Sequence, residues 1–75
     1  MKEVKPGKYK HYKGKFYEVI GAAHHSETLE EFIVYRALYS TKKFGKNSLW
    51  IRPKKMFLEK VRINAKLVPR FKLLT

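Results

Sequence analysis

The sequence predicts an all-β protein: a small SH3-like barrel of five to six short strands with at most one short helical turn. The longest apolar run, residues 31–39, is rich in β-branched and aromatic residues, and its length suits a strand better than a helix. Similar short runs recur along the chain, separated by turn signals such as Pro6-Gly7 and Lys13-Gly14. An OB-like barrel is the alternative that the same pattern allows.

Six segments are expected to be strands, and they are joined by turns and loops. Residues 24–31 form a polar hairpin loop, residues 40–48 form a flexible basic loop, and residues 64–66 form a hairpin turn. Pro53 allows one helical turn over residues 53–57, with proline at its first position. Pro69 interrupts the last strand, which indicates an edge or a bulge there. The expected strands are residues 9–12, 16–23, 31–39, 49–52, 58–63 and 67–73.

The segment from Glu31 to Tyr39 is the predicted interior strand of the sheet. Both of its alternating phases are largely apolar, which is typical of a strand that is covered on both faces. Arg36 is the one residue that breaks this pattern. Its surroundings therefore decide whether the strand is only a scaffold or also carries part of a binding site.

The length of 75 residues predicts a single domain, residues 1–75, in which residues 1–5 form a flexible tail. The chain has no cysteine, so it offers no disulfide and no zinc-thiolate site. It also has no aspartate, which removes most two-carboxylate and magnesium sites. We therefore expect no metal and no cofactor. No apolar run suits a signal peptide or a membrane span, so we expect a cytoplasmic protein without a membrane partner.

The net charge of +12 suggests an anionic partner, most plausibly RNA or DNA. The basic residues are 14 lysines and only 4 arginines, and a lysine bias of this kind also arises from genome composition and aids solubility. The charge is uneven, because residues 16–35 contain four glutamates and no lysine or arginine. This distribution predicts an acidic edge and a basic remainder that a nucleic acid would approach.

Three arginines lie among aromatic residues. The planar guanidinium of arginine can form paired hydrogen bonds and stack on an aromatic ring, which the ammonium of lysine cannot do. Trp50 and Arg52 are two residues apart and share one face of their strand. Arg36, which follows Tyr35, and Arg70 could join Arg52 on one phosphate or carboxylate. The alternative is that each arginine pairs with a glutamate of the chain, for example Glu18, Glu27 or Glu31.

The segment His25-Ser26-Glu27-Thr28 carries groups that suit ligand contact or acid-base catalysis. Chain neighbours rarely form a nucleophile-base pair, however, and a turn of this composition more often satisfies its own backbone. We therefore expect the protein not to be an enzyme.

Five aromatic residues alternate with lysines in the manner of a single-stranded nucleic-acid surface, although core aromatics show the same spacing. We interpret the chain as a nucleic-acid-binding module that uses lysines and an arginine–tryptophan patch. The alternatives are a protein-interaction module, with an open edge near Pro69 and Phe71, and a pocket for a small anion. The candidate binding residues are Arg36, Trp50, Arg52, Arg70, His25, Ser26, Glu27, Thr28, Tyr35, Lys10, Lys13, Lys42 and Lys43.

Five blocks of sequence occur in a recognisable order. They are PGKYKHYKG from Pro6, HSET from His25, VYRALY from Val34, LWIRP from Leu49 with Met56-Phe57, and VPRF from Val68. Together they resemble a family of small bacterial proteins catalogued as a domain of unknown function. The resemblance runs from Pro6 to Phe71 and implies an SH3-type barrel, but no activity, because the family has none assigned. The chain departs from the family pattern in its longer, more basic loop at residues 40–48 and in its greater positive charge.

Overall fold

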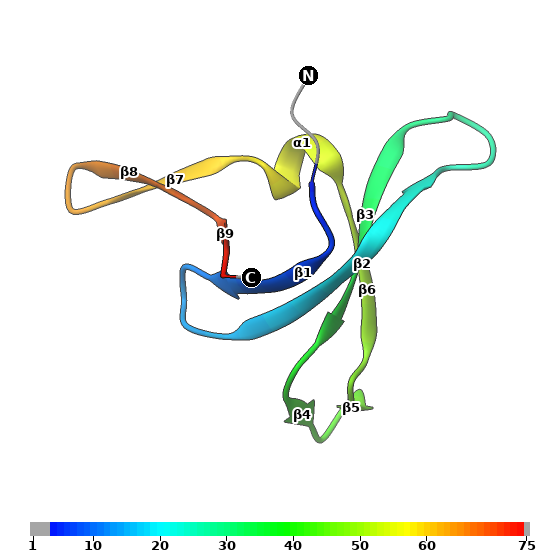
Figure 1. Cartoon of the computed structure of the whole chain (residues 1–75), viewed down its shortest axis with the longest axis horizontal. Coiled ribbons are helices and arrows are strands. Elements are labelled where there is room, and N and C mark those ends of the chain that lie inside the picture. Colours follow the sequence, from blue (N-terminus) through cyan, green and yellow to red (C-terminus); the bar gives the residue numbers. More distant parts are fainter. Residues whose placement is uncertain (1–3, 75) are drawn as a thin grey trace.

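The computed structural model describes residues 4–74, which form nine strands and one short helix (Figure 1). Five strands make one sheet in the order β6-β3-β2-β1-β9, and each neighbouring pair is antiparallel. Their bounds are β1 Gly7–His11, β2 Phe16–His24, β3 Glu31–Ala37, β6 Leu49–Pro53 and β9 Phe71–Leu73. The predicted small all-β, barrel-like fold is confirmed.

Two small ribbons and one helical turn complete the described chain. The first ribbon pairs β4 (Ser40–Thr41) with β5 (Gly45–Lys46), and the second pairs β7 (Lys60–Ile63) with β8 (Lys66–Pro69). The helix α1 (Lys54–Phe57) lies between β6 and β7. Within residues 4–74, no helix is long and apolar enough to cross a membrane.

The predicted turns at residues 13–14 and 64–66 are confirmed. Gly14 adopts φ +104°, a value that favours glycine. Asn64 and Ala65 adopt φ +49° and +65°, so the β7–β8 turn has positive φ at both central positions, as a type I′ hairpin requires. Asparagine tolerates this region better than alanine, so Ala65 carries the greater backbone strain of the two.

Strand boundaries differ from the prediction at several places: β1 spans 7–11 rather than 9–12, β3 ends at Ala37 rather than at 39, and β7 begins at Lys60 rather than at 58. The described residues form nine strands, where five to six were expected.

The basic loop at residues 40–48 contains the β4–β5 ribbon, whose strands of two residues are too short to leave a pattern in the sequence. The segment 67–73 forms two strands in different sheets: Pro69 ends β8, and after Arg70 the chain pairs with β1 as β9. Pro53 precedes α1 as its N-cap, with φ −52° and ψ 137°, whereas the sequence placed proline at the first helical position.

Strand β3 is an interior strand, as predicted, because β2 and β6 pair with its two edges. Its two phases are buried unequally. Ile33, Tyr35 and Ala37 are buried, whereas the alternate phase, which includes Arg36, is half-buried. The prediction that both phases are covered is therefore wrong for one of them, because nothing within residues 4–74 packs over that side as completely as the core covers the other.

The face of the sheet that carries Ile33 and Tyr35 is called the inner face below, and the opposite side is the outer face. The core is built on the inner face from Tyr9, Val19, Ile33, Tyr35, Phe57 and Phe71. Helix α1 contributes Phe57, whose ring stacks on Phe71 with centroids 4.2 Å apart. This stack connects the helix to the last strand.

The predicted flexible tail, residues 1–5, is only partly described. Val4 packs against the core, and the backbone carbonyl of Lys5 accepts a 2.7 Å hydrogen bond from the Tyr9 hydroxyl. The remainder of that prediction, residues 1–3, lies outside the described residues.

Candidate functional site

The sheet register places two of the candidate arginines on opposite faces. Arg36 is opposite Glu18 on β2, whereas Arg52 is opposite the buried Ile33. Arg36 therefore projects from the outer face, where its Nη1 lies 3.5 Å from Glu18 Oε1. Arg52 lies on the inner face, so the structure does not bring these two arginines together.

Arg52 is half-buried among aromatic side chains of the inner face. Its guanidinium carbon lies 5.6 Å from the ring centroid of Phe71, and its Nε donates a 3.4 Å hydrogen bond to the Tyr35 hydroxyl. Among residues 4–74, the ion pairs of arginine with carboxylates involve Arg36 and Arg70 but not Arg52. A half-buried guanidinium needs hydrogen-bond acceptors, so its remaining N–H groups suit an anionic ligand.

Two further tyrosines extend this environment towards β4. The hydroxyls of Tyr17 and Tyr39 share a hydrogen bond of 2.7 Å, and the ring of Tyr17 lies 5.3 Å from that of Tyr35. Burial raises the pKa of Tyr17, and the hydrogen bond with Tyr39 raises it further, while nearby Arg52 opposes the shift. Tyr17 is therefore neutral at physiological pH and can donate a hydrogen bond as well as accept one.

His11, at the end of β1, borders the same environment. Its ring lies 4.9 Å from Phe71, and its Nδ1 accepts a 3.1 Å hydrogen bond from the backbone N–H of Lys13. Burial lowers the pKa of His11, and the positive charges of Arg52, Arg70 and Lys13 lower it further. The neutral ring then carries its proton on Nε2. The positive charges of Arg52, Arg70 and Lys13 all act on the His11 ring.

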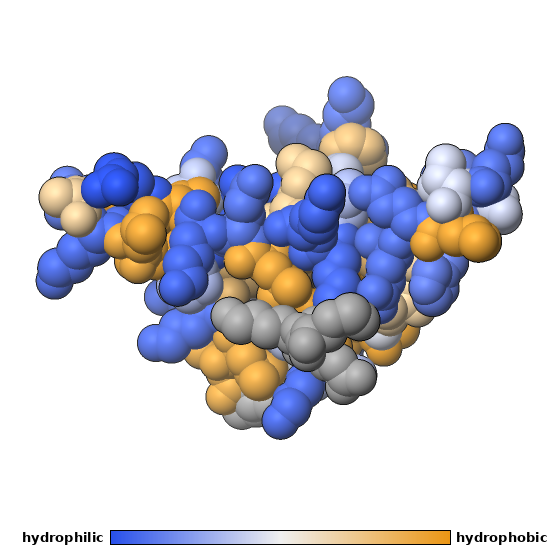
Figure 2. Space-filling view, turned by 90° about the horizontal axis from the view of Figure 1, so that it is seen from above, coloured by the Kyte–Doolittle hydropathy of each residue, from blue (hydrophilic) through white to orange (hydrophobic). Residues whose placement is uncertain are grey.

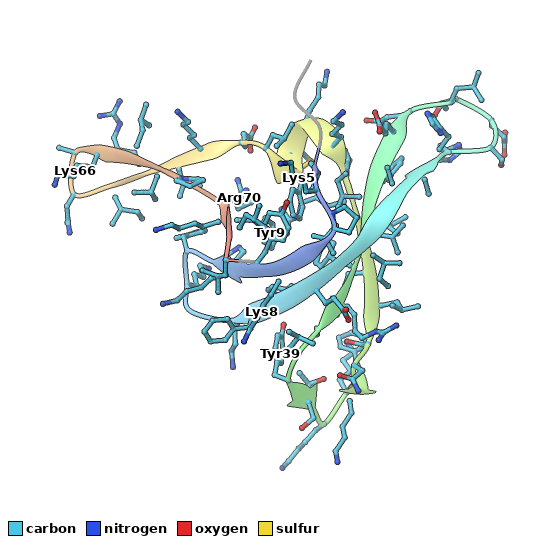
Figure 3. All side chains as sticks on the ribbon, viewed as in Figure 1. Lys5, Lys8, Tyr9, Tyr39, Lys66 and Arg70 are labelled. Carbon is cyan, nitrogen blue, oxygen red and sulfur yellow. The ribbon has the colours of Figure 1, made fainter. Side chains whose placement is uncertain are left out.

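Arg70 is the third candidate arginine and lies between β8 and β9 (Figure 3). Its Nη2 lies 3.0 Å from Glu59 Oε1. The predicted pairing of an arginine with a glutamate therefore occurs twice within residues 4–74: Arg36 pairs with Glu18, as one of the named examples, and Arg70 pairs with Glu59. Its Nε is buried without a hydrogen-bond acceptor among the described residues. Arg70 is thus partly neutralised, yet it still contributes positive potential at His11.

These side chains form one contiguous cluster, which we call the tyrosine–arginine face. Tyr35 and Phe71 are its buried part, and the half-buried side chains of His11, Tyr17, Tyr39 and Arg52 are its accessible part. Cations of the β1–β2 turn border it. Lys15 Nζ is 4.8 Å from the ring centroid of Tyr39, and Lys13 Nζ is 5.9 Å from that of Tyr12, which in turn contacts His11. The members of the tyrosine–arginine face are His11, Tyr17, Tyr35, Tyr39, Arg52 and Phe71.

Trp50 lies beside this face, on the same side of β6 as Arg52. It is opposite Tyr35 in the register, packs against the core, and donates from Nε1 to Ser48 Oγ at 2.9 Å. The ring of Phe44 meets Trp50 edge-on at 4.9 Å, and Lys43 Nζ lies 5.5 Å from the Phe44 centroid. Half of the Phe44 surface is exposed, so this basic, aromatic corner is open to a ligand.

The other predicted residues lie elsewhere. In the loop at 25–30, His25 Nδ1 accepts from the backbone N–H groups of Glu27 and Thr28, and Thr28 Oγ1 accepts from that of Glu30. This loop, which includes Ser26, satisfies its own backbone and occupies the end of the β2–β3 hairpin opposite to the β1–β2 turn (Figure 1). Lys10 lies on the outer face with its Nζ 5.8 Å from the Phe16 centroid, and Lys42 is exposed in the β4–β5 turn.

The lysines that contact aromatic rings within residues 4–74 therefore do not form a single basic face. Lys8 and Lys10 lie over Phe16 on the outer face, whereas Lys13, Lys15 and Lys43 border the aromatic surface of the inner face. A ligand on the tyrosine–arginine face would meet only the second group.

Sequence reasoning missed Tyr17 and Tyr39 as site residues. It named Phe71 only at an open edge for a protein partner, and it considered His11 only as a metal ligand. A signal was present: Tyr17 and Tyr35 lie in the apolar phases of their strands, and a buried tyrosine hydroxyl must find a polar partner. Tyrosines on the core side of neighbouring strands therefore indicate a polar cluster there. Among residues 4–74, no group of three or more histidine, cysteine or acidic side chains is arranged to hold a metal ion.

Comparisons with known proteins give the family. A crystal structure of a protein belonging to DUF1653 from Bordetella bronchiseptica is similar to this chain, with a TM-score of 0.83 and 34% sequence identity over 95% of this chain and 87% of that one. No curated protein matches. The family model described as "protein of unknown function (DUF1653)" matches residues 7–73. The chain therefore belongs to the DUF1653 family.

Proposed function

We propose that the protein is a non-enzymatic module that binds single-stranded nucleic acid through the tyrosine–arginine face. The observation that carries the proposal is Arg52, a half-buried guanidinium that contacts Tyr35 and Phe71 and forms no ion pair within residues 4–74. Its planar fork suits a phosphate, which it can bind through two parallel hydrogen bonds.

The surroundings of Arg52 supply the other parts of such a site. Lys13, Lys15 and Lys43 border the face and would contact neighbouring phosphates. Phe44 and Trp50 offer aromatic surface on which an unpaired base can stack. Stacking of this kind requires bases that are free of a duplex, which favours a single strand.

A group of acidic residues and the lysines that border the tyrosine–arginine face lie at opposite ends of the sheet. Glu27 and Glu30 lie in the loop at 25–30, and Glu31 begins β3 beside it. These carboxylates repel phosphates at that end of the sheet, while the lysines of the β1–β2 and β4–β5 turns attract them at the other end. A bound strand would therefore run across the basic end of the inner face.

Fluorescence anisotropy with a labelled single-stranded oligonucleotide tests the proposal. Arg52→Ala should weaken binding about tenfold, the effect of losing one charge-assisted contact. Arg36→Ala is the matched control, because it removes the same charge from the neighbouring strand but on the outer face. This variant should weaken binding by no more than about twofold, through the loss of general attraction.

Salt dependence separates phosphate contacts from other attraction. The logarithm of the affinity should fall linearly with the logarithm of the salt concentration, and Arg52→Ala should reduce the slope by about one. The proposal fails if no single strand of DNA or RNA binds at about 50 mM salt, or if the two arginine variants lose affinity equally.

A pocket for a small anion is the second candidate, since one tyrosine hydroxyl contacts Arg52 and two others lie in the same cluster. Tyr35 contacts its Nε, and the Tyr17–Tyr39 pair adjoins Tyr35. Calorimetric titration with inorganic phosphate and with a mononucleotide distinguishes the two candidates. Binding of a mononucleotide as tight as that of an oligonucleotide would favour the small-anion pocket.

A further inference from the structure

The β7–β8 ribbon projects from the body of the protein (Figure 1). Its two strands pack chiefly against each other. Ile63 is 41% exposed and Leu67 is 60% exposed, and apolar surface is visible over the ribbon at the left of Figure 2. An isolated two-stranded ribbon is marginally stable in water, so packing against a further surface would stabilise this one.

A groove of about 470 Å³ lies where the ribbon meets the end of β1. Its apolar walls come from Tyr12, Ile63, Val68 and Pro69, and His11 lies among them. Lys10 and Lys72 also line it, and the register places them opposite each other on β1 and β9. The volume is in the range of ligand sites and accommodates one or two large side chains.

The strand register shows that Ile63 and Val68, two of the groove's apolar residues, lie on the same side of the ribbon, while Pro69 lines the groove from the end of β8, opposite Lys60. Ile63 is opposite Lys66, and Val68 is opposite Val61, so these four residues share one side. Leu67 is opposite Arg62 and points to the other side. The side of the ribbon that carries Ile63 and Val68 is therefore apolar, with one cation, Lys66, next to the turn at its tip.

The charges of this region select the occupant. Residues 60–73 carry five cations, of which Arg70 pairs with Glu59, and no acidic residue, so the ribbon repels a second copy of a chain whose net charge is +12. Nucleic acid would neutralise these cations, but it has no aliphatic side chain to fill the apolar walls. We propose that the groove binds an acidic segment of another protein, with one apolar side chain against Ile63 and Val68 and flanking carboxylates on Lys10 and Lys72.

NMR titration of the isotopically labelled protein tests this inference with defined peptides. The probes are acetylated, amidated Glu-Glu-Leu-Glu-Glu, the same peptide with serine in place of leucine, and Lys-Lys-Leu-Lys-Lys. The leucine-centred acidic peptide should shift the signals of Tyr12, Ile63 and Val68 at about 1 mM, with an affinity about tenfold above that of the serine-centred peptide. The basic peptide should produce no shift.

Variants of the ribbon locate the contact. Ile63→Ser should remove the preference for leucine over serine. Leu67→Ser is the matched control, because it alters an exposed leucine on the other side of the ribbon and should keep that preference. Lys72→Glu should weaken both acidic peptides about fivefold or more without changing their ratio. The unchanged backbone spectrum of β1, β2 and β3 checks that each variant is folded.

Three results would overturn the inference. The first is equal affinity for the leucine- and serine-centred peptides, which indicates attraction by charge alone. The second is a dimer in sedimentation that Ile63→Ser dissociates, which assigns the groove to a second copy. The third is a loss of oligonucleotide binding in Ile63→Ser as large as the loss of peptide binding, which assigns the groove to nucleic acid. An oligonucleotide affinity that Ile63→Ser leaves unchanged keeps this inference separate from the proposed function.

Discussion

Arg36 and Arg52 occupy neighbouring strands of one sheet, and both interrupt short runs of apolar residues. Their side chains nevertheless lie on opposite faces. On the outer face, Arg36 is paired with Glu18, and both side chains remain almost half exposed, at 42% and 49%. On the inner face, Arg52 lies against Phe71 and Tyr35, and the described residues give it no carboxylate.

The difference follows from what covers each face. Helix α1 and β9 place Phe57 and Phe71 over the inner face, so a guanidinium there is surrounded by aromatic rings and a tyrosine hydroxyl. The outer face is open, and water screens the charge of an arginine on it. The same residue type is therefore a surface ion pair in one place and a candidate ligand contact in the other.

The largest expected effect is a loss of stability on removing apolar side-chain atoms from the inner face, compared with the same change on the outer face. Ile33, on the inner face, is 1% exposed, and Ile51, on the outer face of β6, is 63% exposed. Ile33→Ala should lower the free energy of unfolding by about 2–5 kcal/mol, because it leaves a cavity in the core. The same substitution at Ile51 should cost less than about 1 kcal/mol. Chemical denaturation measures both, and equal losses would contradict the assignment of the faces.

The hydroxyl pair of the inner face gives the next largest effect. Tyr39→Phe removes the partner of the Tyr17 hydroxyl and should cost about 1 kcal/mol of unfolding free energy. The pKa of Tyr17 should fall, because its hydrogen bond with Tyr39 is one cause of the raised value, yet it should stay above the ordinary value of 10.0 because burial remains. Spectrophotometric titration follows the tyrosines. Tyr12→Phe, at an exposed ring, is the control, and an equal loss of stability there would count against the inner-face pair.

The ion pair of the outer face should contribute less. A double-mutant cycle with Glu18→Ala and Arg36→Ala should give a coupling free energy of about 0.2–1 kcal/mol, since both side chains are exposed to water. Raising the salt concentration to about 1 M should reduce this coupling towards zero. A large coupling that does not change with salt would show that the Arg36–Glu18 pair is shielded from water, in contradiction to an open outer face.

The smallest effect is a gradual dependence of stability on pH. The pKa of folded His11 is below its ordinary value of 6.5, so the unfolded chain takes up a proton first as the pH falls. The free energy of unfolding should therefore decrease below about pH 6.5 and stop decreasing once the pH is below the pKa of the folded state. His11→Gln should remove this dependence, whereas His24→Gln, at the exposed end of β2, should retain it. Denaturation at a series of pH values measures this dependence. If the free energy of unfolding of His11→Gln still falls in the same pH range, His11 is not the cause.

Much of the strand pattern is predictable because it depends on local composition. The β-branched and aromatic runs locate β2, β3 and β6 to within a few residues, and Pro69 marks the end of β8. The β4–β5 ribbon is not predictable in this way, because two-residue strands have no period. In the candidate site, Trp50 and Arg52 could be paired from their spacing, but Tyr39 and Phe71 could not, since their positions depend on how distant segments meet.

The sequence by itself determined that the protein is a small, strongly basic, all-β module in which an arginine interrupts an interior strand. Hydrophobic periodicity and turn residues act over a few positions, so they can be recognised without a fold. Only the tertiary structure decided which arginine lies among the aromatic rings. The register of β2, β3 and β6, with a bulge between Val19 and Gly21, sets the face to which each side chain points. The packing of Phe57 and Phe71 then makes that face an aromatic environment around Arg52, and these contacts join β6, α1 and β9.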